Sequence, residues 1–111
     1  MTYLNVDENG LISLDELKSS IKKSTLLIAI MHVNNETGII QPINQISEIA
    51  QENNICFFCD ATQAVGKVKV DVKTDNIDLL CFSGHKLNGP KGIGILFKKN
   101  NILLNPLIHG G

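Results

Sequence analysis

The sequence lacks a charge excess, a long apolar run and a basic leader. Its 111 residues carry a formal net charge of −1, which argues against nucleic-acid binding because that function needs a basic face. No apolar stretch approaches the ~20 residues of a membrane-spanning helix. The first residues have neither the basic and apolar regions of a secretory signal nor the arginines of a transit peptide. We therefore expect a protein of the cytoplasm or the mitochondrial matrix, and the sequence does not distinguish between these two compartments.

Cysteine is also scarce, and its arrangement does not suggest disulfides. The three cysteines form an odd set. Cys56 and Cys59 have the C-x-x-C spacing of redox and zinc sites, but the apolar residues around them predict a buried strand. Side chains three positions apart on a strand point to opposite faces, so these two thiols can neither pair nor share a metal. We expect the cysteines to pack in the core and to bind no metal.

The residues that are present, 43% hydrophobic and 19% charged, suit one small globular core. A capping box at residues 13–16 predicts a helix that ends near Lys22 and Lys23. Pro42 suits the first position of a second helix, which Asn53 and Asn54 can end in a left-handed conformation. Apolar runs predict four strands, at residues 25–32, 55–59, 78–82 and 92–97. We expect the first strand to be covered on both faces and the last to be an antiparallel edge strand.

This order of elements predicts an α/β fold with a mostly parallel sheet and helices on both faces. Polar side chains follow the first three strands, at Asn35, at Asp60 and Gln63, and at residues 83–86. In open α/β sheets ligands bind outside the carboxyl ends of the strands, so we expect these groups to share one edge. Taken singly, each has a structural alternative that stays open: Asp60 and Ser83 as local caps, and Asn35 at a left-handed position.

Lys86 is the most informative of these residues. It follows a buried strand in a sharp turn, where an amine suits covalent chemistry better than packing. Free in water the amine titrates near pH ~10.4, and burial or a nearby cation lowers that pKa, so that the amine can form a Schiff base with a carbonyl. Pyridoxal 5′-phosphate has such a carbonyl. Its ring nitrogen needs a carboxylate, as Asp60 offers, and its ring hydroxyl needs donors such as Gln63 and Asn35.

The phosphate of this cofactor needs hydroxyl, imidazole and backbone N–H groups, which Ser83 and His85 offer in one turn. Two other residues draw attention without joining the set. Lys91 lies in a glycine-rich loop that lacks the P-loop pattern, so we expect it to be solvated. His32 ends a strand, and we expect it to be a structural histidine with its hydrogen bonds satisfied.

Three motifs in this order resemble the class V aminotransferase family, and within it the cysteine desulfurases. They are H-V-N-N-E-x-G at residues 32–38, D-A-T-Q-x-x-G at 60–66, and S-G-H-K at 83–86, followed by G-P-K-G-I-G at 89–94. The resemblance implies the large domain of the type I pyridoxal-phosphate transferases, with residues 1–111 as one incomplete piece of it. It also implies Lys86 as the catalytic Schiff-base lysine, with cofactor-binding residues at Asn35, Asp60, Gln63, Ser83 and His85.

The resemblance further implies what the protein does. A cysteine desulfurase removes sulfur from L-cysteine, leaving L-alanine and an enzyme persulfide, for iron–sulfur cluster or thio-cofactor synthesis. Such an enzyme is a homodimer that hands sulfur to an acceptor or scaffold protein, and it requires no nucleic acid or membrane. Its persulfide cysteine lies beyond the matching region, so Cys81 is not that residue, and we expect the 111 residues alone to be inactive. A selenocysteine lyase, an aminotransferase or a non-catalytic remnant stays an alternative.

Overall fold

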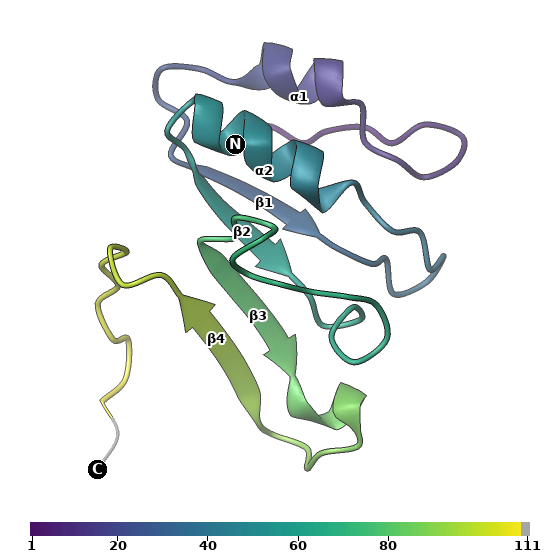
Figure 1. Cartoon of the computed structure of the whole chain (residues 1–111), viewed down its shortest axis with the longest axis vertical. Coiled ribbons are helices and arrows are strands. Elements are labelled where there is room, and N and C mark those ends of the chain that lie inside the picture. Colours follow the sequence, from purple (N-terminus) through teal and green to yellow (C-terminus); the bar gives the residue numbers. More distant parts are fainter. Residues whose placement is uncertain (110–111) are drawn as a thin grey trace.

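A computed structural model describes residues 1–109, which form a four-stranded sheet with its helices beside it (Figure 1). The strands lie in chain order, with β1 and β2 parallel, β2 and β3 parallel, and β4 antiparallel to β3. The elements are α1 (Leu14–Ser20), β1 (Leu27–Met31), α2 (Ile43–Glu52), β2 (Cys56–Asp60), β3 (Leu79–Ser83), the 3-10 helix η1 (Gly84–Leu87) and β4 (Gly94–Lys98). The expected mostly parallel α/β sheet with an antiparallel edge is confirmed.

Helix α1 begins where the sequence predicted and ends earlier. The Ser13 hydroxyl accepts a hydrogen bond from the Glu16 amide (3.2 Å), which is one half of the capping box. The Glu16 carboxylate does not return to the cap, because it accepts hydrogen bonds from Asn5 instead. The helix stops at Ser20, before Lys22 and Lys23, since the Lys22 amide donates to the Thr25 hydroxyl and starts a turn.

Helix α2 begins one residue later than predicted. Pro42 is its N-cap and not its first helical residue, because its ψ of 69° is not helical. The predicted stop is confirmed at Asn54, which has a φ of 54°. One face of the helix is buried, and its apolar residues are the four that the spacing predicted, namely Ile43, Ile46, Ile49 and Ala50.

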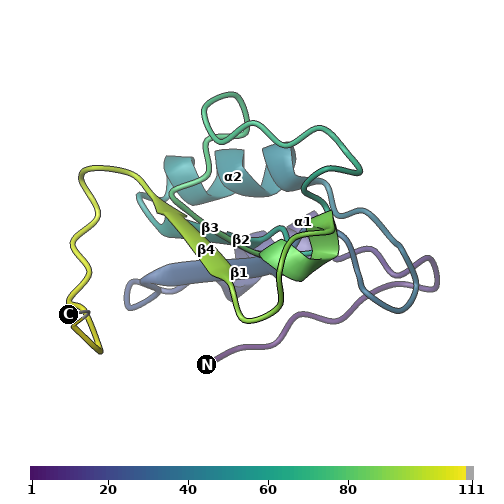
Figure 2. The same ribbon diagram turned by 90° about the horizontal axis from the view of Figure 1, so that it is seen from below.

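The two faces of the sheet differ in burial. Figure 2 shows α2 lying over one face, where the core side chains are Ile28, Phe57, Cys59 and Leu80. On the other face of β1, Leu27, Ala29 and Met31 are exposed. The prediction that this first strand is covered on both faces is therefore wrong for residues 1–109, because β1 is an edge strand here and α2 packs on the opposite face. A row of apolar residues alone does not show which face a neighbouring element covers.

Strand β2 carries the C-x-x-C pair and shows why it is not a site. Cys59 is fully buried, whereas Cys56 is half-buried and points to the other face, as the alternation of a strand requires. All three cysteines are free thiols. The strand reaches one residue beyond the predicted run, so that Asp60 is its last residue.

Asp78 joins three elements at the amino end of the sheet. One of its carboxylate oxygens accepts a hydrogen bond from the Phe57 amide on β2 (2.9 Å). The other forms an ion pair with the Lys99 ammonium, just after β4 (2.8 Å). The Lys99 amide also donates to the Asp78 carbonyl (2.9 Å). These contacts hold β2, β3 and β4 in register, and the side chain of Asp78 is 17% exposed while that of Lys99 is 33% exposed.

Candidate functional site

The carboxyl ends of β1, β2 and β3 lie at one edge of the sheet, as predicted. Their arrowheads point the same way in Figure 1. The register aligns Met31 with Asp60 and Asp60 with Cys81, so these three residues form one row across the sheet. The chain beyond each strand remains tied to its neighbour, because the His32 amide donates to the Asp60 carbonyl (2.8 Å) and the Ala61 amide donates to the Cys81 carbonyl (2.9 Å).

Asp60 and Gln63 lie in a tight turn that follows β2. The amides of Ala64 and Val65 both donate to the Ala61 carbonyl, which closes one helical turn. One oxygen of the Asp60 carboxylate accepts a hydrogen bond from the Thr62 amide (2.9 Å), so Asp60 does cap this turn. Its other oxygen has no N–H or O–H donor among residues 1–109, and Asp60 is only partly buried. That oxygen is therefore available to a ligand.

The Gln63 side chain is held by a residue that the sequence reasoning did not single out. Its amide oxygen accepts a hydrogen bond from the Lys67 ammonium at 2.9 Å. The four-residue spacing inside a helical turn is the signal that could have revealed this contact, because such residues lie on the same side of the turn.

Lys86 lies in η1, directly after β3, in a loop closed by backbone contacts. The Gly84 amide donates to the Ile93 carbonyl (2.9 Å), and the Gly89 amide donates to the Gly84 carbonyl (3.0 Å). Gly89 is required for this closure, since a Cβ there would lie 2.8 Å from the Gly84 carbonyl oxygen. The Lys86 side chain is exposed, and its amine has no hydrogen-bond partner in the described part of the chain.

Ser83 and His85, the predicted phosphate ligands, contact each other. The Ser83 hydroxyl and the His85 Nδ1 are 2.7 Å apart. Ser83 makes no side-chain bond to the start of η1, so it does not act as a helix cap. The pair presents a hydroxyl and an imidazole beside the Lys86 loop, which is the donor chemistry expected for an anion.

Asn35 lies in the loop after β1 and is exposed. The turn around it is built by its neighbour, because the Asn34 side chain accepts hydrogen bonds from the amides of Glu36 (2.9 Å) and Thr37 (3.0 Å). The left-handed position of this turn belongs to Gly38 (φ 74°) and not to Asn35. The structural alternative for Asn35 is therefore not observed, and its side chain makes no hydrogen bond within residues 1–109.

Of the six predicted site residues, which all lie within residues 1–109, only Ser83 and His85 share a side-chain hydrogen bond. The others follow the ends of adjacent strands at the same edge of the sheet, and their individual roles stay predictions. Cys81 is a further neighbour of this edge, aligned with Asp60. Burial, followed by the nearby Asp60 carboxylate, raises the pKa of its thiol.

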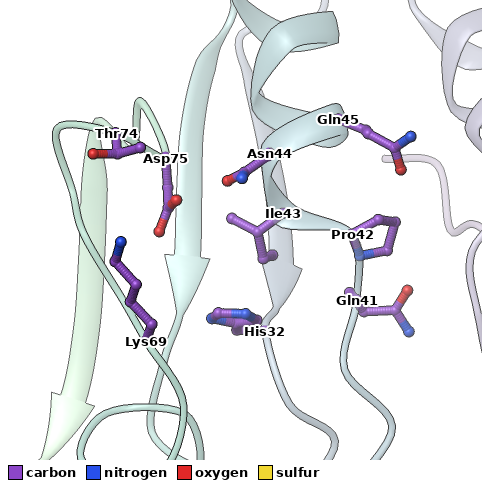
Figure 3. A pocket seen from close by; sticks show the side chains of 9 residues that line it. All are labelled: His32, Gln41, Pro42, Ile43, Asn44, Gln45, Lys69, Thr74 and Asp75. Carbon is purple, nitrogen blue, oxygen red and sulfur yellow. The ribbon is translucent and has the colours of Figure 1, made fainter.

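A cavity of about 540 Å³ lies between the end of β1, the start of α2 and residues 69–75 (Figure 3). His32 lines it and is buried as expected, with 6% of its surface exposed. Its Nδ1 has no hydrogen-bond partner, which corrects the expectation of a satisfied histidine. Burial lowers the pKa of His32, and the Asp75 carboxylate partly opposes that shift. None of the predicted cofactor residues lines this cavity.

None of the helices in residues 1–109 combines the length and apolar character needed to cross a bilayer. In the same part of the chain, the acidic, histidine and cysteine side chains form no cluster of three or more that could hold a metal ion.

Comparison with known proteins gives consistent matches over the whole chain. It is 54% identical over 111 residues to the cysteine desulfurase IscS of Methanosarcina thermophila and 55% identical over 114 residues to that of Plasmodium falciparum. All of this chain is covered in both cases, but only 28% and 21% of those proteins. The chain thus spans less than a third of the length of these curated relatives.

Solved structures match as well. A structure described as SspA in complex with cysteine has a TM-score of 0.94 and 49% identity, covering 99% of this chain and 32% of that one. A NifS-like protein has a TM-score of 0.94 and 38% identity, covering 99% of this chain and 31% of that one. The family model for class V aminotransferases matches residues 1–111. The chain therefore belongs to the class V aminotransferase family.

Proposed function

We propose that the protein containing this chain is a cysteine desulfurase, which uses pyridoxal 5′-phosphate to remove sulfur from L-cysteine. The products would be L-alanine and a persulfide on the enzyme, for iron–sulfur cluster or thio-cofactor synthesis. The observation that carries the proposal is the single sheet edge on which Asp60 ends β2 while Lys86 follows β3. The IscS names of relatives at 50–55% identity support the choice of substrate.

The side chains at this edge fit the cofactor. The Lys86 amine is exposed and has no hydrogen-bond partner in the described residues, so it is free to react with an aldehyde. One carboxylate oxygen of Asp60 accepts no N–H or O–H hydrogen bond from residues 1–109. The Ser83 and His85 pair suits a phosphate. An amine, a carboxylate and phosphate donors at one edge match the three chemically distinct ends of pyridoxal phosphate.

Each residue has a defined task in this proposal. When bound, the cofactor supplies an electron-withdrawing ring. The Lys86 amine would bind the cofactor through its aldehyde and would accept the substrate α-proton. Asp60 keeps the ring nitrogen protonated, because a neighbouring carboxylate raises that nitrogen's pKa. Gln63 and Asn35 would donate hydrogen bonds to the ring oxygen.

In this proposal the persulfide forms on a cysteine outside residues 1–111. Cys56, Cys59 and Cys81 lie within strands, and burial raises the pKa of each thiol, that of Cys59 to about 12. A thiol that stays protonated is a poor nucleophile. We propose further that the whole protein is a homodimer that hands sulfur to an acceptor or scaffold protein, in the cytoplasm or the mitochondrial matrix.

The test uses the full-length protein loaded with pyridoxal phosphate. Borohydride reduction followed by peptide mass spectrometry should find the cofactor fixed to Lys86, and Lys86→Ala should abolish this fixation. Lys91→Ala, a nearby exposed lysine, is the matched control and should leave it unchanged. L-cysteine should release sulfide in the presence of a thiol reductant. Fixation that survives Lys86→Ala would refute the lysine assignment, and amino transfer to a 2-oxo acid without sulfide release would refute the desulfurase activity.

A further inference from the structure

The contact between Lys67 and Gln63 determines how the Gln63 amide is oriented. The two side chains meet at 2.9 Å across four residues of the turn that follows β2. A lysine ammonium has three donors and no acceptor, so the atom that it contacts must be the amide oxygen and not the amide nitrogen. The Gln63 NH2 group is consequently turned away from Lys67.

That NH2 group has no acceptor among residues 1–109. Gln63 is half-buried, so its free side offers two donors at the edge of the site. An amide held in this way can donate to an anionic oxygen but cannot present its own oxygen to it. In the reverse orientation the Gln63 amide oxygen would face the anionic oxygen, and both atoms are acceptors. The Lys67 ammonium would then also lose its acceptor.

The turn that carries this pair also packs against the loop that carries Lys86. Gly66 has a φ of 79°, and a Cβ there would lie 2.5 Å from the Leu87 side chain. The turn that carries Gln63 and Lys67 therefore lies against Leu87, the residue next to Lys86.

We propose that Lys67 is a positioning residue that keeps the Gln63 NH2 group directed at the ionised ring oxygen of pyridoxal phosphate. The inference rests on the proposed function and adds a residue to it. A fixed donor stabilises the deprotonated ring oxygen and so lowers the pKa of the bound chromophore. Without Lys67 the amide is free to rotate, and this stabilisation weakens.

The experiment follows the visible absorption of the cofactor-loaded full-length protein as a function of pH. Lys67→Met should raise the pH midpoint of the spectral change by about one unit, since a hydrogen bond to a charged group is lost for part of the time. Lys67→Arg, which also offers only donors, should restore the midpoint. Lys69→Met is the matched control, because Lys69 lines the separate cavity and should not affect the spectrum.

A double-mutant cycle shows whether Lys67 acts through Gln63. Gln63→Leu should raise the midpoint as well, and adding Lys67→Met to it should change nothing further. Lys67→Ala serves as a second removal should the methionine variant fail to fold. A midpoint unaltered by Lys67→Met, or additive shifts in the double variant, would overturn the inference while leaving the proposed function intact. Absence of any cofactor band in the unaltered protein would instead overturn the proposed function and this inference with it.

Discussion

The aspartates at the two ends of the sheet differ in how many protein hydrogen-bond and ion-pair partners their carboxylates have. At the amino end, both oxygens of Asp78 are engaged, one by the Phe57 amide and the other by Lys99. At the carboxyl end, Asp60 uses one oxygen to cap a turn, and the described chain provides no N–H or O–H donor for the other. A carboxylate with two protein partners holds elements together, whereas one with a free oxygen at the ligand-binding edge is available for chemistry.

Burial explains why both arrangements are tolerated. The Asp78 side chain is only 17% exposed, and a carboxylate so far from water is costly unless it is paired and hydrogen-bonded. Asp60 is less buried, and the Lys86 amine is exposed to water. The groups at the carboxyl end can therefore lack protein partners without a large loss of stability.

The largest expected effect comes from Asp60→Asn in the full-length protein. Sulfide release from L-cysteine should fall by about 100-fold, because a neutral amide no longer stabilises the charge that develops on the ring. The thermal unfolding midpoint should stay close to that of the unaltered protein. A variant that keeps its rate but loses stability would mean that Asp60 resembles Asp78, and the contrast between the two ends would collapse.

The opposite result is expected for Asp78→Asn. Losing the ion pair with Lys99 and weakening the bond to the Phe57 amide should lower the free energy of unfolding by about 1–3 kcal/mol. The rate per folded molecule should not change. The midpoint of urea unfolding measures the first quantity, and sulfide release at low temperature measures the second. Lys99→Met should lower stability in the same direction.

His32 provides a smaller, pH-dependent test at the carboxyl end. Burial lowers its pKa below the usual 6.5, so the folded protein binds fewer protons at this site than the unfolded chain does at acidic pH. Its contribution to stability is therefore present above pH 6.5 and is lost as the pH falls below that value. The thermal unfolding midpoint should fall as the pH is lowered from 7.5 to 5, and it should fall less steeply in His32→Gln than in the unaltered protein. Equal slopes in the two proteins would contradict this assignment.

The smallest effects concern two thiols that report on the two ends. Burial raises the pKa of both, with further contributions from Asp78 at Cys56 and from Asp60 at Cys81. Asp78→Asn should speed the alkylation of Cys56, and Asp60→Asn should speed that of Cys81, since each removes a negative charge that disfavours the thiolate. Iodoacetamide labelling at pH 8.5, followed by mass spectrometry, measures both. If Asp78→Asn also changed the alkylation of Cys81, or Asp60→Asn that of Cys56, the two ends would be coupled.

Local sequence was enough to predict where most elements lie. The apolar runs located every strand to within about two residues, and Asn54 ends α2 in the predicted left-handed conformation. It was not enough for contacts that depend on distant residues. The Glu16 carboxylate accepts a hydrogen bond from Asn5, eleven positions away, and not from the Ser13 amide of its capping box. Nothing in the local pattern of residues 13–16 indicates that competing partner.

The same division applies to the site. The order of three polar motifs after three apolar runs already indicated the α/β class, the family and the residues at the sheet edge, because parallel strands bring their carboxyl ends to one side. The folded arrangement was needed to show that Ser83 contacts His85, that Lys67 donates a hydrogen bond to Gln63 and that Asp60 aligns with Cys81. Side-chain partners depend on register and on rotamers in three dimensions, whereas the periodicity of a strand or helix is written along the chain.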